Sequence, residues 1–315
     1  MRAQDRVLRW GLAGSLCAMA IGAAYTAWAG AEDGSKAGAK YLRLLRADGE
    51  PVALQTSIVR FTSAKPELAG VTADLIGAVH VGEPSYYQTL NDEFAKYDVV
   101  LYELVAPAGT RVPKGTSPRN DHPVGALQNG LKGMLNLEHQ LEHVDYTKEN
   151  LVHADMSPDD FFKSMENKNE SVWSLFFRMM GAGMAQQAKR QAQGKGDDFE
   201  ILLALFDPNR SVALKRVMAE QFEDLEGMMT AVEGPDGTTL IAERNKVALE
   251  GLTRQIAAGK KKIAVFYGAG HLPDMEKRLV ADGFTRGEER WLTAWDMHDP
   301  AGAKKKREAA PATAK

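Results

Sequence analysis

The chain has 315 residues, of which 44% are hydrophobic and 26% charged, with a formal net charge of −3. This composition is typical of a globular protein long enough for one elaborated domain, and a mildly acidic chain lacks the basic surface that nucleic-acid binding requires. Its single cysteine, Cys17, excludes a disulfide scaffold and a zinc site built from thiolates. A metal ion would therefore have to be bound by nitrogen and oxygen atoms.

The N-terminal segment has the features of an export signal. Arg2, Arg6 and Arg9 precede an uncharged stretch at 10–29 that ends in Ala-Trp-Ala, a small-x-small pattern read by signal peptidases. The stretch is also nearly long enough to span a bilayer, so an uncleaved anchor remains open. We expect residues 1–29 to be a signal peptide or anchor, and the folded part to be periplasmic or secreted.

The next part of the chain predicts strands and one helix. Apolar runs at 52–61 and 71–76 predict two strands, 85–96 predicts a helix capped by Ser85, and 98–105 predicts an almost continuous apolar strand. Strand, helix and strand in this order form a βαβ unit, which implies a parallel pair joined by a right-handed crossover.

The middle of the chain, at about 106–235, has a different character. Glycine and proline come first, and long patterns rich in methionine and charge follow, with little strand signal. Ser157-Pro158 and Asp207-Pro208 are typical helix starts. We therefore expect a helical insertion or cap, with the apolar segment 174–185 in its core because that segment is too short to cross a membrane.

The last third returns to alternating elements. Two helices and two strands are predicted, at 238–258, 272–281, 262–267 and 291–295. We therefore expect an α/β domain over 40–298, with a mixed, largely parallel sheet flanked by helices, and a disordered tail at 299–315.

Two of the predicted strands end in the same motif, Gly-x-x-His. The first copy is Gly77-Ala78-Val79-His80 and the second is Gly268-Ala269-Gly270-His271. Glycines let the end of a strand turn sharply and approach a ligand closely. Because open α/β sheets bind ligands at the carboxyl ends of their strands, we expect both imidazoles in one crevice.

Four segments together resemble the TraB/GumN family: Leu75–His80, Val100–Glu103, Ala242–Asn245 and Phe266–Leu272. That family is similar to the TIKI metalloproteases and, more distantly, to the ChaN-like and erythromycin esterase proteins. The resemblance implies an α/β fold with a mixed sheet, a helical insertion and a site built from these four segments. In TIKI proteins the implied activity is metal-dependent peptide hydrolysis, whereas TraB-type members are known mostly for pheromone shutdown. The central region shows no such resemblance, so substrate choice is not implied.

The residue types of these segments support a metal site. His80, His271 and Glu103 offer two imidazoles and one carboxylate, a set that binds Zn²⁺, Mn²⁺, Co²⁺ or Fe²⁺ and leaves positions open for water. Such an ion would lower the pKa of bound water and polarise a carbonyl group. Glu103 has a second interpretation, because a carboxylate in an apolar strand must be paired and could simply balance Arg244.

Three neighbouring residues at a predicted helix are expected to assist this site. Arg244 would hold a substrate carboxylate or the developing oxyanion, and Asn245 would make a positioning hydrogen bond. Glu243 is expected to support the metal ligands or to act as general base.

Two competing motifs point to other chemistry. His139-Gln140-Leu141-Glu142-His143 fits the inverted zinc-protease pattern, although it lies in the helix-rich middle and Glu220 is not a compelling third ligand. Gly268-Ala269-Gly270 is similar to a dinucleotide-binding loop, but Pro273 stands where the third glycine is required.

The sequence thus predicts an exported metal-dependent hydrolase, with a peptide bond as the leading target and an ester or lactone as the next. The alternative is a non-catalytic protein that uses the same crevice to sequester a peptide or a small ligand such as haem. A peptide or small molecule is the expected partner. No nucleic acid is expected, and a membrane only through the N-terminal segment.

Overall fold

The computed structural model describes both α/β portions and parts of the middle of the chain, namely residues 41–116, 133, 135–171, 174, 203–222, 233 and 237–298. The expected leader at 1–29, the expected tail at 299–315 and nearly all of the apolar segment 174–185 lie outside these residues. Within the described ranges, no helix combines the length and apolar character needed to cross a membrane.

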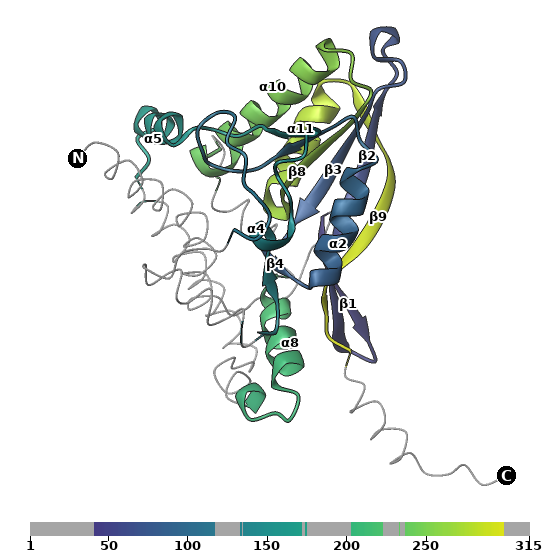
Figure 1. Cartoon of the computed structure of the whole chain (residues 1–315), viewed down its shortest axis with the longest axis vertical. Coiled ribbons are helices and arrows are strands. Elements are labelled where there is room, and N and C mark those ends of the chain that lie inside the picture. The colour runs from purple at the N-terminus through teal and green to yellow at the C-terminus, as the bar shows by residue number, and fades with distance from the viewer. Residues whose placement is uncertain are drawn as a thin grey trace, which may run out of the picture.

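A mixed sheet of seven strands forms the centre of the molecule (Figure 1). The strands are β1 (Leu42–Ala47), β2 (Glu50–Ser63), β3 (Thr72–Ala78), β5 (Val99–Tyr102), β7 (Leu151–His153), β8 (Lys262–Gly268) and β9 (Phe284–Asp296). β3, β8, β5 and β7 lie side by side in this order and run parallel. β2 pairs antiparallel with β1, β3 and β9. The predicted α/β class with a mixed, largely parallel sheet is confirmed.

The parallel strands bring the two Gly-x-x-His motifs together. β3 and β5 run parallel as the βαβ pattern predicts, but β8 from the last third of the chain lies between them. In the register of β3 and β8, Ala78 is the partner of Gly268. The two strands therefore end at the same edge of the sheet, with their motifs side by side.

Helices pack on the sheet and around its edges (Figure 1). Those described are α2 (Pro84–Phe94), α4 (Gln140–His143), α5 (Pro158–Asn167), α8 (Arg210–Phe222), α10 (Arg244–Ala257) and α11 (Leu272–Ala281). Their predicted starts are only partly right. Ser157 caps α5, because its Oγ accepts a hydrogen bond from the Asp160 N–H at 3.1 Å, as predicted. Helix α2 begins at Pro84, so Ser85 is not its cap.

α2 and α10 cover opposite faces of the sheet. Phe94 of α2 meets Phe266 of β8 edge-on, with the ring centroids 4.8 Å apart. Gly251 of α10 lies against Leu101 of β5. In the register of β5 and β8, Leu101 is one residue before the partner of Phe266, and successive strand residues point to opposite faces. Both faces of the parallel strands are therefore buried, which explains their continuous apolar runs.

The middle of the chain is not purely helical. The expected helical insertion at 106–235 includes α5 and α8, but Leu151–His153 form β7 and extend the main sheet beside β5. A strand of three residues is too short to show an alternating pattern, so the sequence could not reveal it. This correction adds a fourth parallel strand, and with it a fourth strand end.

Candidate functional site

Each of the four parallel strands is followed by an ionisable residue at the same edge of the sheet. In the order of the strands, β3, β8, β5 and β7, these residues are His80, His271, Glu103 and Asp155. Asn245 and Arg244 reach the same place from the first turn of α10. The carboxyl ends of parallel strands are the usual ligand-binding edge of an α/β sheet.

Gly268 is the point at which three of the predicted site residues meet. A Cβ atom at this position would lie 3.3 Å from Glu103 Oε2, 3.8 Å from His80 Nε2 and 3.8 Å from His271 Cδ2. Its backbone N–H donates to Glu103 Oε2 at 2.7 Å. The structure thus brings the two imidazoles and the carboxylate around one position, where glycine leaves room that any side chain would fill.

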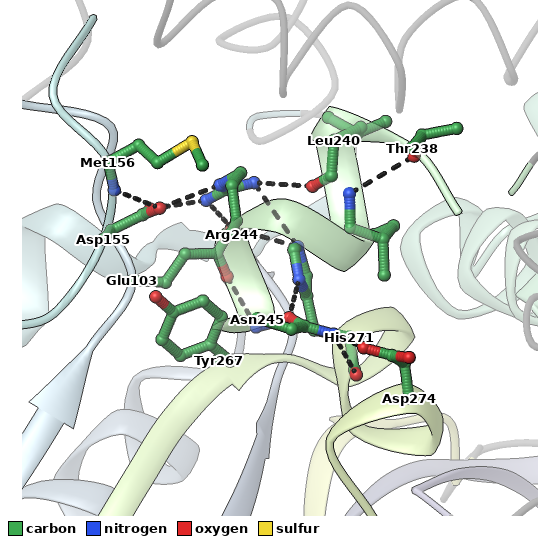
Figure 2. A network of polar contacts seen from close by, with 12 residues as sticks. Glu103, Asp155, Met156, Thr238, Leu240, Arg244, Asn245, Tyr267, His271 and Asp274 are labelled. Carbon is green, nitrogen blue, oxygen red and sulfur yellow. Dashed lines mark hydrogen bonds and ion pairs between the residues drawn. The ribbon is translucent and has the colours of Figure 1, made fainter. Parts of the chain in front are cut away.

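Arg244 lies at the centre of the polar network (Figure 2). Its Nε and Nη2 donate to the two carboxylate oxygens of Asp155 at 2.9 and 2.6 Å, and Nη2 also donates to Glu103 Oε1 at 2.7 Å. Its Nη1 is 3.4 Å from the Leu240 carbonyl oxygen and 3.4 Å from His271 Nε2. All five N–H bonds of the guanidinium thus face acceptors in the protein.

This saturation bears on the role expected for Arg244. The side chain is 2% exposed, so a substrate carboxylate or oxyanion could bind it only in exchange for one of these internal partners. Holding Glu103 beside His271 is the role that the geometry gives it directly.

Asn245 fixes the orientation of the His271 ring. Asn245 Nδ2 donates to the His271 carbonyl oxygen at 3.0 Å and to Asp274 Oδ2 at 2.8 Å, so its Oδ1 is an acceptor. His271 Nδ1 lies 2.7 Å from that oxygen and must carry the proton. The lone pair of Nε2 therefore faces Glu103 Oε1, 3.6 Å away, and Arg244.

Burial and the neighbouring charges determine which groups are ionised. Burial lowers the pKa of His271 from 6.5 to about 4, so its ring is neutral at pH 7. Burial alone would raise the pKa of Glu103, but the charge of Arg244, the two imidazoles once acid has protonated them, and the Gly268 N–H together bring it well below its ordinary value. One arginine and two carboxylates, Glu103 and Asp155, leave the cluster with a net charge of −1.

His80 is the more accessible of the two imidazoles. It is half-buried, and its carbonyl oxygen accepts from the Gln140 N–H at 3.0 Å. Among the described residues, none makes a hydrogen bond to its ring. Its side chain is the one that can turn toward a ligand without breaking an existing bond.

The cluster has the chemistry of a metal site but not the closed geometry of one. Over the described ranges, only Glu138, Glu142 and His143 place three ligand atoms within 4.8 Å of one another. Two nitrogens, one carboxylate oxygen and a surplus negative charge are a suitable donor set for a divalent ion. To bind an ion with all three donors, the His80 ring must turn toward Glu103 and His271, and Arg244 Nη1 must move away from His271 Nε2.

Glu243 is not brought to the site. Its carboxylate oxygens lie 3.2 Å from Lys168 Nζ and 2.8 Å from Lys246 Nζ. It belongs to a π-helical turn, Thr239–Glu243, that leads into α10. Neighbouring helical residues point in different directions, so Glu243 turns outward where Arg244 turns inward.

The inverted zinc-protease motif does not form in its expected geometry. His139 belongs to a short strand, β6 (Glu138–His139), in which it pairs with Val81, and helix α4 begins only at the next residue. The two histidines of the motif therefore do not lie one helical turn apart. Glu220, the weak candidate for its third ligand, instead pairs with Arg46 at 3.1 Å.

Asp155 is the site residue that the sequence did not reveal. Its signal was faint, because the strand before it has only three residues and the helix start at Ser157-Pro158 follows at once. The sequence indicates Asp155 only by a succession of three features: an apolar stretch, an acidic residue and a helix start.

Comparisons with protein-family models, with curated proteins and with solved structures find no match to this chain. The resemblance to the TraB/GumN family therefore rests on the motif residues and remains a prediction.

Proposed function

We propose that the protein is an exported hydrolase that uses a divalent metal ion at the carboxyl ends of β3, β8 and β5. The convergence of His80, Glu103 and His271 around Gly268, inside a cluster of net negative charge, is the observation that carries this proposal. A surplus buried negative charge is unfavourable unless a cation offsets it.

His80, His271 and Glu103 would hold the ion. When bound, such an ion lowers the pKa of a coordinated water toward about 7 and polarises a carbonyl group. His271 is suited to this role because its ring is neutral and Asn245 holds Nδ1, so the Nε2 lone pair can bind the ion once it gives up its 3.4 Å contact with Arg244 Nη1.

The other residues of the cluster keep these groups in place. Arg244 donates to Glu103 Oε1 and the Gly268 N–H donates to Glu103 Oε2, so the carboxylate cannot rotate freely. Both Arg244 and Asn245 are buried, which excludes water from behind the site. A low-dielectric surrounding strengthens the interaction of the cluster with a cation in front of it.

A neutral acyl group is the substrate that suits this arrangement. The donors of Arg244 are engaged within the protein, so the described residues of the cluster favour an amide or ester carbonyl over a free carboxylate. We propose a peptide bond first and an ester or lactone second.

A non-catalytic binding protein is the second candidate. The observation in its favour is the saturation of Arg244, whose guanidinium already lies beside Glu103 Oε1 and His271 Nε2. Such a protein would keep the crevice and bind a peptide or a small ligand there.

Metal analysis of the purified full chain separates the two. We expect about one ion per chain in the wild type and a loss of at least about tenfold in metal affinity in both His80→Ala and His271→Ala. Digestion of a peptide library should stop in the same variants. His143→Ala is the matched control, because His143 belongs to the separate group with Glu138 and Glu142. A wild type free of metal, or a metal lost only in His143→Ala, would contradict the proposal.

A further inference from the structure

Asp155 makes a more complete contact with Arg244 than a salt bridge that serves only stability requires. Its side chain is 0% exposed, and both of its oxygens accept from the guanidinium, at 2.9 and 2.6 Å (Figure 2). The Met156 N–H also donates to Oδ1 at 2.8 Å, which holds the carboxylate itself. A two-point contact between a carboxylate and a guanidinium fixes the plane of both groups.

The fixed plane determines what the rest of the guanidinium faces. With Nε and one Nη2 proton on Asp155, the other Nη2 proton meets Glu103 and Nη1 meets His271. The distance of 3.6 Å between Glu103 Oε1 and His271 Nε2 is thus maintained by a group that Asp155 holds. Among the hydrogen bonds and ion pairs of the described residues, none joins Asp155 directly to Glu103 or His271.

Asp155 also decides the charge of the cluster. Arg244 and Glu103 alone would form a neutral pair, and the carboxylate of Asp155 brings the total to −1. A buried pair that served only stability would need a single carboxylate, because every further buried charge adds a desolvation penalty. The second carboxylate is unfavourable unless the cluster meets another cation.

We propose that Asp155 is a positioning residue of the metal site, which acts through Arg244 to keep Glu103 and His271 in place and gives the cluster its negative charge. This inference rests on the proposed function. Through Asp155, the end of β7 and the middle of the chain then contribute to the site, which the two Gly-x-x-His motifs alone do not reveal.

Titration of Zn²⁺ and of Mn²⁺ into chelator-treated full-length protein tests it. In Asp155→Asn we expect the dissociation constant of the ion to rise about 10- to 100-fold while the protein stays folded, the usual effect of removing a residue that orients a ligand. Thermal unfolding, measured on the same metal-free samples, reports the structural part of the effect separately.

Asp74→Asn is the matched control. Asp74 is 1% exposed and also accepts a two-point contact, from Arg60 Nε and Nη2 at 3.1 and 3.0 Å. It lies in β3 at the opposite end of the sheet from the site. Its substitution should lower the unfolding temperature and leave the dissociation constant of the ion within about twofold of the wild type, because no ligand depends on it.

A second variant keeps the proposal testable if Asp155→Asn does not fold. Asp155→Asn/Arg244→Gln replaces both partners of the two-point contact with amides and leaves Glu103 as the one charge of the cluster, so the net charge of −1 is kept while positioning is lost. We expect its dissociation constant to rise at least about tenfold. An unchanged constant in either folded variant overturns the role of Asp155. A wild type that binds neither ion refutes the proposed function itself, and the inference with it.

Discussion

The two ends of the parallel sheet carry the same contact in different surroundings. At the amino end, Asp74 of β3 receives a two-point contact from Arg60, whose side chain is 41% exposed. At the carboxyl end, Asp155 receives the same contact from Arg244, whose side chain is 2% exposed. Only the second arginine also donates to another buried carboxylate, Glu103.

The difference shows what turns a structural contact into part of a candidate site. At the amino end Asp74 is the one buried carboxylate that Arg60 meets, because its other partner, Glu288 at 3.6 Å, is exposed to solvent, and the Tyr97 hydroxyl also donates to Asp74. At the carboxyl end the charges do not balance, and two imidazoles lie beside the surplus. An arginine–aspartate contact therefore does not indicate a functional site by itself. What marks the candidate site is a buried contact with surplus negative charge next to histidines.

Removing the arginine at each end should give the largest contrast. Arg244→Leu leaves Glu103 and Asp155 buried without their cation, which we expect to lower the free energy of unfolding by about 3 to 5 kcal/mol. Arg60→Leu leaves only one buried carboxylate, Asp74, to which the Tyr97 hydroxyl still donates, so a smaller loss of about 1 to 3 kcal/mol is expected. Urea unfolding of both variants measures this. Equal losses at the two ends would show that burial of the cluster does not matter.

Acid should affect the carboxyl end before the amino end. The pKa of His271 is about 4 in the folded protein and 6.5 in an unfolded chain, so between these values the unfolded chain binds more protons. The free energy of unfolding of the metal-free protein should therefore have its full value above pH 6.5. It should fall by up to about 3 kcal/mol as the pH drops to about 4.

Two comparisons isolate this effect. His271→Gln removes the titrating group, and we expect the dependence between pH 6.5 and 4.5 to disappear with it. Glu103, whose pKa is lowered by Arg244 against the opposing effect of burial, contributes a separate loss only below its ordinary value of 4.5. A slope that persists in His271→Gln would assign the transition to another group.

The smallest of these effects should come from adding one methyl group. Gly268→Ala places a Cβ atom 3.3 Å from Glu103 Oε2 and 3.8 Å from both imidazoles, so we expect about 1 kcal/mol of lost stability and weaker metal binding. Gly287→Ala is the matched control, because a Cβ atom there meets only the Arg60 carbonyl oxygen, at 3.4 Å. Unchanged metal affinity in Gly268→Ala would show that the position next to Gly268 is not where the ion binds.

The parallel core was predictable because its strands are buried on both faces. Continuous apolar runs at 71–76 and 262–267 correspond to β3 and β8, and the predicted helix 272–281 has the bounds of α11. The positions of His80 and His271 follow from these strands, because each histidine comes within about three residues of a strand end, at Ala78 and Gly268. Glu103 was predictable for the same reason.

The rest of the site depends on contacts that a sequence pattern does not contain. Asp155 follows a strand too short to be recognised, and its partner Arg244 is 89 residues further along the chain. Glu243 and Arg244 are neighbours in the sequence, yet one faces two lysines and the other the buried cluster. Side-chain direction at the start of α10 is set by tertiary packing, which periodicity cannot resolve at a single turn.

The central claim is that one divalent ion binds beside Gly268. Crystals of the full chain grown with Zn²⁺ and measured at the zinc absorption edge test it most directly. The account predicts one anomalous-difference peak within about 2.3 Å of His80, His271 and Glu103 ligand atoms. A peak only among Glu138, Glu142 and His143, or no peak at all, would contradict it.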